Sequence, residues 1–378
     1  MSVSVEINHK ELKQMLSKVW QTKLSLNITG TVGIGKSVAV REYSEQLTIE
    51  ENCEFIAWNE VDKDTKDKVM KNPKGKLVYL DIRLSQFDST DLKGIPKIDA
   101  DIILEWLIQN WLYCLTNPDV KAVVFFDEMN LAPPSVQASA YQIINDRCMG
   151  DVKLGDNVII VSAGNSLEDK ANVYDMAKPL CNRFIHATLL PPDVDDWGNW
   201  ANKHGVDHRI IAYLQMKPDE LFAFSPDSPE NAFPTPRSWA KFVSPLIDGI
   251  DHNNKLFQKL VASAVGTGVA VTFTSWLRLQ DTIDFNAILK NPKEIKKIDR
   301  IDMQFSLVAI ICEWLKKNHN KQGCDTLIDM LEQLAPEFAI LVLKNAVENY
   351  LTDLRKHFGT NSKWKKHMSQ EYAKYLKD

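Results

Sequence analysis

The sequence has little of what would mark a secreted or a membrane-spanning protein. None of its six cysteines forms a CxxC pair or a zinc-type spacing, which argues against a disulfide scaffold and a structural zinc site. No apolar run is long enough to cross a bilayer, and residues 1–16 lack the apolar core of a signal peptide. A formal charge of −5 gives no general reason for nucleic-acid binding. We therefore expect a cytoplasmic protein with reduced thiols and no membrane contact.

What the sequence does have is an alternating pattern in its first half. At 378 residues, with 44% hydrophobic and 25% charged residues, the chain is long enough for two or three domains. Up to about residue 192, almost continuous apolar runs alternate with helical patterns, which is typical of a parallel sheet covered on both faces. The predicted strands are 24–29, 53–58, 76–84, 121–128, 157–165 and 184–190.

The pattern changes after residue 193, where the β-type runs stop and helical patterns continue toward the C-terminus. We predict three regions: an α/β core over 1–192, a helical lid over 193–285, and a further helical region over 286–378 that could dock a partner. The lysine- and aspartate-rich segment 62–76, between two predicted strands, is expected to form a solvated loop because its charges are mixed.

The segment GTVGIGKS, residues 30–37, follows a predicted strand and precedes a predicted helix. It matches the pattern G-x-x-x-x-G-K-[ST] at every fixed position. Such glycines let successive backbone N–H groups point into one concavity, and the following helix adds the positive end of its dipole. The motif predicts a phosphate cradle in which Lys36 reaches the β- and γ-phosphates and Ser37 ligates Mg²⁺. The predicted binding residues are Gly30, Thr31, Val32, Gly33, Ile34, Gly35, Lys36, Ser37 and Val38.

Two carboxylates end the predicted strand AVVFFDE. Asp127 and Glu128 would emerge at the carboxyl end of a buried strand, where parallel sheets bind ligands. We predict that Asp127 holds the Mg²⁺ shell and that Glu128 orients and deprotonates an attacking water. A strand that simply ends in acidic residues is the alternative, and the glycine loop about 90 residues earlier makes it less favoured.

Three further polar residues follow elements of this pattern. Asn165 ends the predicted strand 157–165, where it could hold a water or a phosphate, although an asparagine there is more often a turn residue. Arg183 stands on a short connection before the next strand, and Arg237 begins a lid-like helix just after a proline. An ordinary surface arginine is the alternative for Arg183.

The order of these motifs resembles that of AAA+ ATPases, and the details resemble the MoxR/midasin branch. DEMNLAPPSVQ (127–137) is similar to the extended Walker B segment of that branch, and NRF (182–184) to its arginine-finger segment. The resemblance covers about residues 10–285. It implies ATP and Mg²⁺ as ligands, Asn165 as sensor 1, Arg237 as sensor 2, and Arg183 as a finger acting on the ATP of a neighbouring subunit.

A finger supplied in trans implies a homo-oligomeric ring, which we expect to be a hexamer. Members of this branch carry hairpins that face a central pore, and residues 147–158 look like the hairpin before sensor 1. Residues 87–99 lie near the place of a second insertion, but this segment is short and lacks the usual glycine–proline stretch.

The sequence thus predicts a MoxR-like AAA+ ATPase that remodels a protein partner in a chaperone-like way. The resemblance suggests a partner with a von Willebrand factor A domain. One alternative is a nucleic-acid motor or loader on the same core, against which the net charge argues weakly. Another is an assembly module in which ATP only holds a ring together, against which the Asp127–Glu128 pair argues. These residues do not distinguish ATP from GTP.

Overall fold

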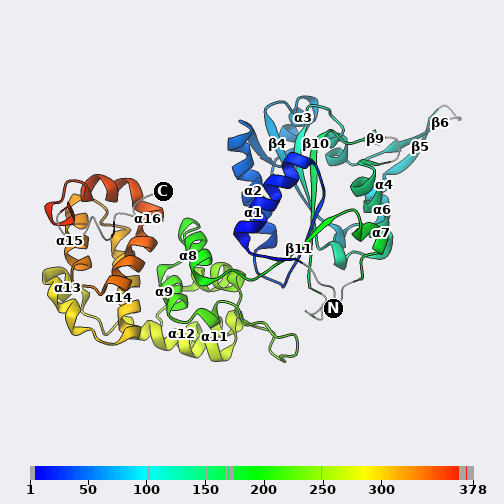
Figure 1. Ribbon diagram of the computed structural model, residues 1–378. Coiled ribbons are helices and arrows are strands. Elements are labelled where there is room, and N and C mark those ends of the chain that lie inside the picture. Colours follow the sequence, from blue (N-terminus) through cyan, green and yellow to red (C-terminus); the bar gives the residue numbers. More distant parts are fainter. Residues whose placement is uncertain are drawn as a thin grey trace. The chain divides into compact units, whose positions relative to one another are not determined.

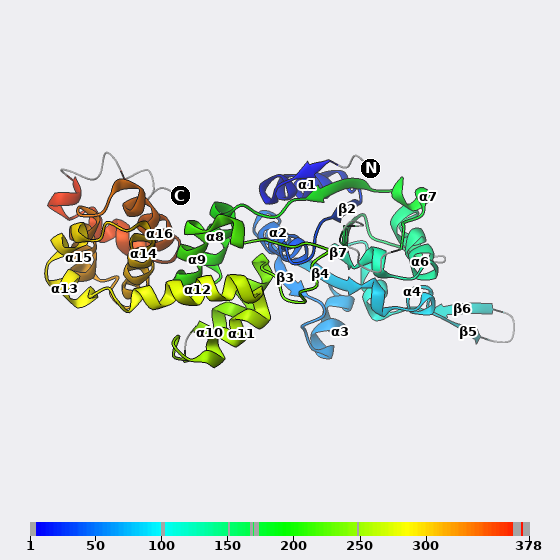
Figure 2. The same cartoon turned by 90° about the horizontal axis from the view of Figure 1, so that it is seen from below.

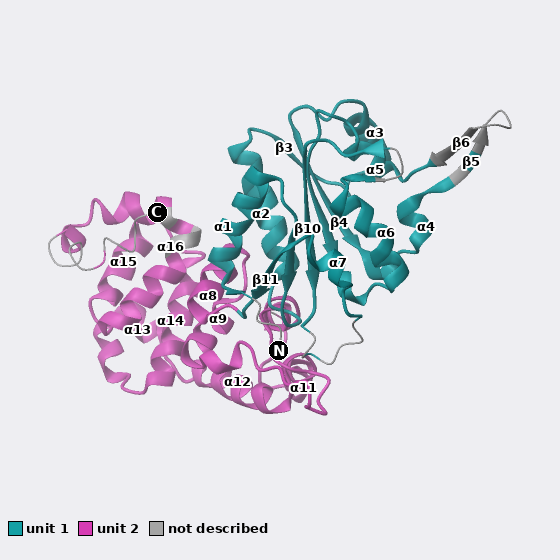
Figure 3. Ribbon diagram, turned by 45° about the vertical axis from the view of Figure 1, so that its right-hand side comes forward, with its two compact units in different colours: residues 1–191 teal, residues 192–378 magenta. Residues whose placement is uncertain are grey.

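The chain forms an α/β unit followed by a helical unit. The structure is a computed structural model that describes residues 5–99, 103–149, 152–166, 169, 174–247, 249–365 and 372. Its two compact units are residues 1–191 and 192–378, which Figure 3 draws in teal and magenta. The predicted α/β fold class with a parallel-sheet core is confirmed (Figure 1). The division of the second unit at residue 285 stays a prediction.

A seven-stranded sheet, formed by the described residues, is the centre of the first unit. Its order is β1 (Glu6–Ile7), β11 (Ile185–Leu189), β2 (Leu26–Thr29), β10 (Asn157–Gly164), β7 (Lys121–Asp127), β4 (Lys76–Arg83) and β3 (Glu54–Ala57), and all neighbours are parallel. Each predicted apolar run became one of these strands. The remaining strand, β1, was not predicted, because its two residues are too few to give an apolar run.

Helices cover both faces of this sheet, because its central strands are apolar on both sides (Figures 1 and 2). Residues 122–126 of β7, for example, are fully buried. The helix α2 (Lys36–Glu50) packs on one face and α1 (His9–Thr22) packs against α2. The opposite face buries a hydrophobic cluster with side chains from α4 (Ser89–Lys93), α5 (Asn110–Leu115) and α6 (Pro134–Asn145). A short helix, α7 (Lys178–Cys181), precedes β11.

The segment 62–76 is not the solvated loop that its charges predicted. Residues Lys63–Lys71 form the helix α3. Its N-cap Asp62 accepts a 2.7 Å hydrogen bond from the backbone N–H of Thr65, and Val69 is fully buried in the core. The prediction was wrong because a single apolar anchor on a capped, charged helix leaves almost no periodic signal.

Two antiparallel hairpins extend the first unit. The strands β8 (Cys148–Met149) and β9 (Val152–Lys153) pair within the predicted hairpin 147–158, of which residues 150 and 151 lie outside the described part. The strands β5 (Ile95–Asp99) and β6 (Ile103–Leu107) form a second hairpin, which Figure 2 shows projecting from the body of this unit. The second hairpin therefore continues beyond the predicted segment 87–99.

In the described part of the second unit, all regular secondary structure is helical. In order it contains α8 (Val194–Lys203), α9 (His208–Met216), η4 (Pro218–Glu220), the π-helix η5 (Ser238–Val243), α10 (Ser244–Ile247), α11 (Lys255–Val265), α12 (Thr267–Gln280), α13 (Phe285–Lys290), η6 (Pro292–Lys297), α14 (Ile301–Leu315), α15 (Lys321–Leu331) and α16 (Pro336–Phe358). One hydrophobic cluster surrounds Tyr213, Trp239 and Phe273, and a second is built from α14, α15 and α16. Among the described helices, none is long and apolar enough to cross a bilayer.

A buried histidine makes the stability of the second unit depend on pH. His208 at the start of α9 is 2% exposed, and within the described part of the chain its Nδ1 has no hydrogen-bond partner. Burial lowers the pKa of His208 to about 4, and the positive charges of Lys316 and Arg209 also lower it. The negative charges of Asp207 and Glu313 raise the pKa in part. Because the unfolded chain takes up this proton near pH 6.5, acid favours unfolding between about pH 6.5 and pH 4.

We expect His208→Gln to reduce this acid sensitivity. Urea unfolding of the wild type should lose up to about 3 kcal/mol between pH 6.5 and pH 4 through this group alone. The variant should lose correspondingly less over the same range, whatever its stability at pH 7. His357→Gln, at a partly exposed histidine, is the matched control. Equal pH slopes for His208→Gln and the wild type would contradict the prediction.

Candidate functional site

The loop between β2 and α2 forms a cradle of backbone groups. At Gly30 an added Cβ would lie 2.7 Å from the carbonyl oxygen of Leu189 on the neighbouring strand β11, so only glycine fits there. Gly35 has φ 98° and turns the chain into α2, which begins at Lys36. The loop therefore ends at the N-terminus of a fifteen-residue helix, where backbone N–H groups and the helix dipole favour an anion.

Lys36 lies under this loop with 8% exposure. Its Nζ donates to the carbonyl oxygens of Gly30 at 2.6 Å and Thr31 at 3.0 Å, and to Oδ1 of Asn165 at 3.4 Å. These bonds hold a positive charge beside the loop and connect it to the end of β10. Lys36 and Asn165, which the sequence pattern assigns separately to phosphate and water binding, therefore lie within hydrogen-bond distance of each other.

Ser37 and Asp127 meet across the same edge of the sheet. The Oγ of Ser37 donates a 2.8 Å hydrogen bond to Oδ2 of Asp127. The other carboxylate oxygen, Oδ1, accepts from the backbone N–H of Glu128 at 2.9 Å. A hydroxyl from the cradle and a carboxylate from β7 are thus brought together although they are 90 residues apart in the chain.

Glu128 has the left-handed backbone conformation, with φ 55° and ψ 35°. A non-glycine residue in this region costs roughly 1 kcal/mol or more and persists only where the surroundings impose it. The turn leads directly into the 3₁₀ helix η2 (Met129–Leu131). The side chain of Glu128 accepts a short hydrogen bond from the hydroxyl of Ser85, in the 3₁₀ helix η1 (Leu84–Gln86) after β4. The side chain of Glu128 therefore bonds to Ser85, whereas that of the adjacent Asp127 bonds to Ser37.

Asn130 fixes the position of Asn165. Its Nδ2 donates to the carbonyl oxygen of Asn165 at 2.8 Å, and its Oδ1 accepts from the N–H of Asn165 at 3.1 Å. The preceding Gly164 allows this approach, because a Cβ there would lie 2.7 Å from Oδ1 of Asn130. Both backbone groups of Asn165 are therefore held by one side chain, which leaves its amide directed to Lys36.

The two predicted arginines are exposed and stand on other segments of the chain. Arg183 is exposed on the turn between α7 and β11, and within the described residues no hydrogen bond or ion pair joins its side chain to the cradle. Arg237 is exposed in the second unit at the start of η5, where Thr235 and Ser238 exchange backbone-to-side-chain hydrogen bonds of 2.7 and 3.0 Å. Their predicted roles as finger and sensor 2 stay predictions.

Sequence reasoning missed several residues of the site. Ser85 and Asn130 were detectable, because each follows closely on a strand that ends at the same sheet edge. Asp169 hydrogen bonds to the side chain of Thr31 and the N–H of Val32; burial raises the pKa of its carboxyl, which the charge of Lys36 and these bonds oppose. His9, whose Nε2 lies 2.9 Å from the carbonyl oxygen of Ile34, gave no signal because it comes 21 residues before the motif.

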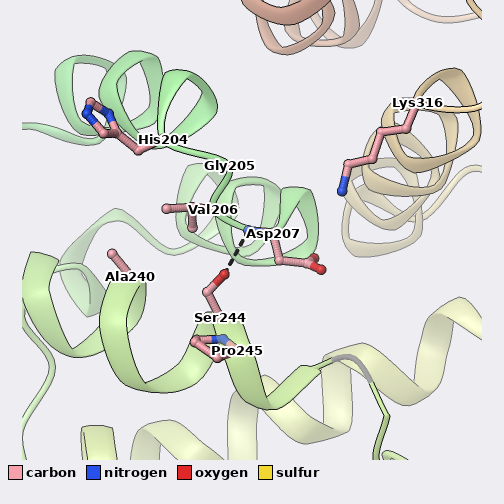
Figure 4. Close-up of a pocket in the computed structure, with 8 residues that line it drawn as sticks. All are labelled: His204, Gly205, Val206, Asp207, Ala240, Ser244, Pro245 and Lys316. Atoms are coloured by element: carbon pink, nitrogen blue, oxygen red, sulfur yellow. Dashed lines mark hydrogen bonds between the residues drawn. The ribbon is translucent and has the colours of Figure 1, made fainter.

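A pocket of about 350 Å³ in the second unit is a weaker candidate (Figure 4). His204, Ser244 and Lys316 line it together with Asp207, whose backbone N–H is held by Ser244 at 3.0 Å. The carboxylate of Asp207 is bound by Arg209 at 2.7 Å, and Lys316 pairs with Glu313 at 2.6 Å. Because its main charges are already paired with neighbours, this pocket offers no comparable set of reactive groups.

The first unit thus assembles its polar groups at one edge of the sheet, from β2, β10, β7 and β4. The cradle and Lys36 suit a phosphate chain, and Ser37 with Asp127 offers the hard oxygen ligands that Mg²⁺ prefers. Glu128 adds a separately held carboxylate that can accept a proton. This arrangement can bind a nucleotide phosphate and activate a water beside it.

The chain has distant likenesses to solved structures, whereas no protein-family model and no curated protein matches it. The chain is similar to NtrX from Brucella abortus in complex with ADP, at 12% identity over 97% of this chain and 68% of that one, with a TM-score of 0.37. It is also similar to PCH-2 from C. elegans, at 14% identity over 80% and 68%, with a TM-score of 0.31.

A match to a candidate ATPase from Cytophaga hutchinsonii has 14% identity and a TM-score of 0.29. It covers 49% of this chain and 47% of that one, so the chain spans about half the length of that protein. Likenesses at this level assign no family. The residues of the site carry the functional conclusion.

We expect Lys36→Ala to weaken nucleotide binding, because it removes the positive charge that the loop holds beside the proposed phosphate site. Calorimetric titration of the full chain with Mg-ATP and Mg-ADP measures this, and the affinity should fall at least about tenfold. Lys18→Ala, at an exposed lysine of α1, is the control and should bind as the wild type does. An unchanged affinity in Lys36→Ala would show that the loop is not a phosphate cradle.

Proposed function

We propose that this protein is an ATPase of the AAA+ type. The observation that carries the proposal is the convergence of Lys36 and Ser37 from the glycine loop with Asn165 and Asp127 from two neighbouring strands, through hydrogen bonds of 3.4 and 2.8 Å. If the glycines formed only an ordinary turn, the contacts of Lys36 with Asn165 and of Ser37 with Asp127 would not be expected. ATP is the proposed substrate.

In the proposed reaction, a water attacks the γ-phosphorus of ATP and the bond from that phosphorus to the β,γ-bridging oxygen breaks. Glu128 takes the proton of the water, and ADP leaves with the bridging oxygen. Lys36 and the loop N–H groups balance the charge on the phosphate oxygens. Asn165, whose backbone Asn130 fixes, orients the water or the γ-phosphate.

The residues of the site fit Mg²⁺ only together with a nucleotide. Within the described part of the chain, no group of three or more His, Cys, Asp or Glu side chains could hold a metal alone. Ser37 and Asp127 supply two oxygens 2.8 Å apart, and phosphate oxygens would complete the shell. When bound there, Mg²⁺ would neutralise charge on the phosphates.

We further propose that the protein works as a homo-oligomeric ring, taken to be a hexamer, with each site completed by Arg183 of a neighbour. The exposure of Arg183, with no bond to its own cradle among the described residues, supports this. The resemblance to the MoxR/midasin branch favours a cytoplasmic, chaperone-like remodeller of a protein partner, and it suggests a partner with a von Willebrand factor A domain. The hairpins β5–β6 and β8–β9 lie near the segments in which that branch carries insertions.

Glu128→Gln should leave Mg-ATP affinity within about twofold of the wild type and lower turnover by at least about 10²-fold. It removes the proton acceptor but keeps the cradle and the size of the side chain. Phosphate release and calorimetric titration of the full chain measure the two quantities. Glu60→Gln, at an exposed carboxylate of the same unit, is the control. Normal hydrolysis by Glu128→Gln would remove Glu128 from the mechanism.

Arg183→Ala should lower turnover at least about 10²-fold in a uniform ring, and activity should return partly when this variant is mixed with Lys36→Ala subunits. Rescue is expected because an intact cradle on one chain then meets an intact arginine on the next. Phosphate release across a series of mixing ratios measures it, with subunit exchange verified by labelled chains. Absence of rescue in rings shown to be mixed would contradict the proposal that Arg183 acts on the site of a neighbouring subunit.

A further inference from the structure

A second polar pocket lies one strand away from the candidate ATP site. It has a volume of about 310 Å³, at the lower end of the range for ligand pockets. Its walls come from residues 58–59 after β3, residues 80–83 of β4, Gln86 at the end of η1 with the following Phe87, and Trp111 of α5. None of these residues belongs to the glycine loop, although Arg83 on β4 is in register with Asp127 on β7.

The pocket exists because β3 is shorter than β4. The strand β3 ends at Ala57, whereas β4 continues to Arg83. Asn59 partly replaces the missing strand: its Nδ2 donates to the carbonyl oxygen of Asp81 at 2.9 Å, and its Oδ1 accepts from the N–H of Asp81 at 3.1 Å. The backbone at Asp81 is therefore satisfied, and the pocket presents side chains to a ligand.

Two buried polar atoms of the pocket residues have no hydrogen-bond partner among the residues that the structure describes. They are Oδ1 of Asp81, an acceptor, and Nε1 of Trp111, a donor. Trp111 itself is only 5% exposed. Native proteins satisfy nearly all such atoms, so these two indicate a ligand that offers one donor and one acceptor.

The charges around Asp81 and the aromatic walls of the pocket favour a cation as the hydrogen-bond donor of the ligand. Burial raises the pKa of Asp81, and the nearby carboxylates of Asp127 and Glu128 raise it further, whereas Arg83 and Arg41 lower it. Among the described residues, no ion pair includes Asp81. The aromatic walls of Trp58, Phe87 and Trp111 suit a planar cation, because a guanidinium stacks on aromatic faces and is more weakly hydrated than an ammonium.

We propose that this pocket binds an arginine side chain of a polypeptide, with the guanidinium donating to Asp81 and a carbonyl of the same residue accepting from Nε1 of Trp111. The proposal does not depend on ATP hydrolysis. It places a protein-contact site on the first unit, beside β4.

Calorimetric titration of the full chain with N-acetyl-L-arginine amide tests the proposal. This probe carries a guanidinium and a free carbonyl, and it should bind saturably at one site. N-acetyl-L-citrulline amide has nearly the same shape without the charge, and it should bind at least about tenfold more weakly. No saturable binding of the arginine probe, or equal binding of both probes, would overturn the proposal.

Three variants locate the site. Asp81→Asn keeps the shape of the side chain and should weaken the arginine probe at least about tenfold, while Trp111→Phe should weaken it about threefold or more. Asp119→Asn, at a carboxylate of the same unit that pairs with Lys74 at 3.4 Å, should leave the affinity unchanged. Wild-type affinity in both Asp81→Asn and Trp111→Phe would place the probe elsewhere and refute the assignment.

Sedimentation velocity identifies the source of the arginine. If a second copy of this chain supplies it, saturating probe should dissociate the assembly, and Asp81→Asn should sediment as the smaller species. If another protein supplies it, the sedimentation of the chain should not change with the probe. Mg-ATP affinity in the same variants separates this site from the cradle, because Asp81→Asn should retain it.

Discussion

The hydrogen bond between Ser37 and Asp127 depends on the register of the parallel sheet more than on either residue. Val161 of β10 pairs with Leu26 of β2 on one side and with Phe125 of β7 on the other, so the three strands end almost level. A one-residue slip of β7 would turn Asp127 to the other face of the sheet. The apolar residues of β7, fully buried over 122–126, therefore fix the position of a polar group at its end.

Several features of the site lower stability when considered alone. Lys36 is almost buried, and Glu128 has a strained backbone. Local hydrogen bonds compensate for these costs. Two loop carbonyls accept from Lys36. Asp127 accepts from the N–H of Glu128, and Ser85 donates to the side chain of Glu128. Such an arrangement holds charged groups in place before a ligand arrives, which reduces the reorganisation that binding requires.

The sequence was sufficient for the sheet and for the glycine loop that leads into α2, since long apolar runs and a motif with fixed spacing are strong local signals. The sequence was insufficient for contacts between distant segments and for elements too short or too charged to show a periodic pattern. Asp169 reaches the loop from a distant segment, and β1 is too short for periodicity. The helix α3 was missed because its charges concealed one buried valine. The pocket that Asp81 and Trp111 line could not be inferred, because it arises only from the unequal lengths of β3 and β4.

The 3₁₀ helix η1 has three residues, and Phe87 closes its turn with a 3.2 Å hydrogen bond to the carbonyl oxygen of Leu84. Ser85 in this turn touches Glu128, while Gln86 beside it lines the neighbouring pocket. One turn of backbone is thus common to both sites, and it cannot move for one without moving for the other. Thermodynamic linkage then requires reciprocity: by whatever factor a guest in the pocket changes the affinity for nucleotide, nucleotide changes the affinity for that guest.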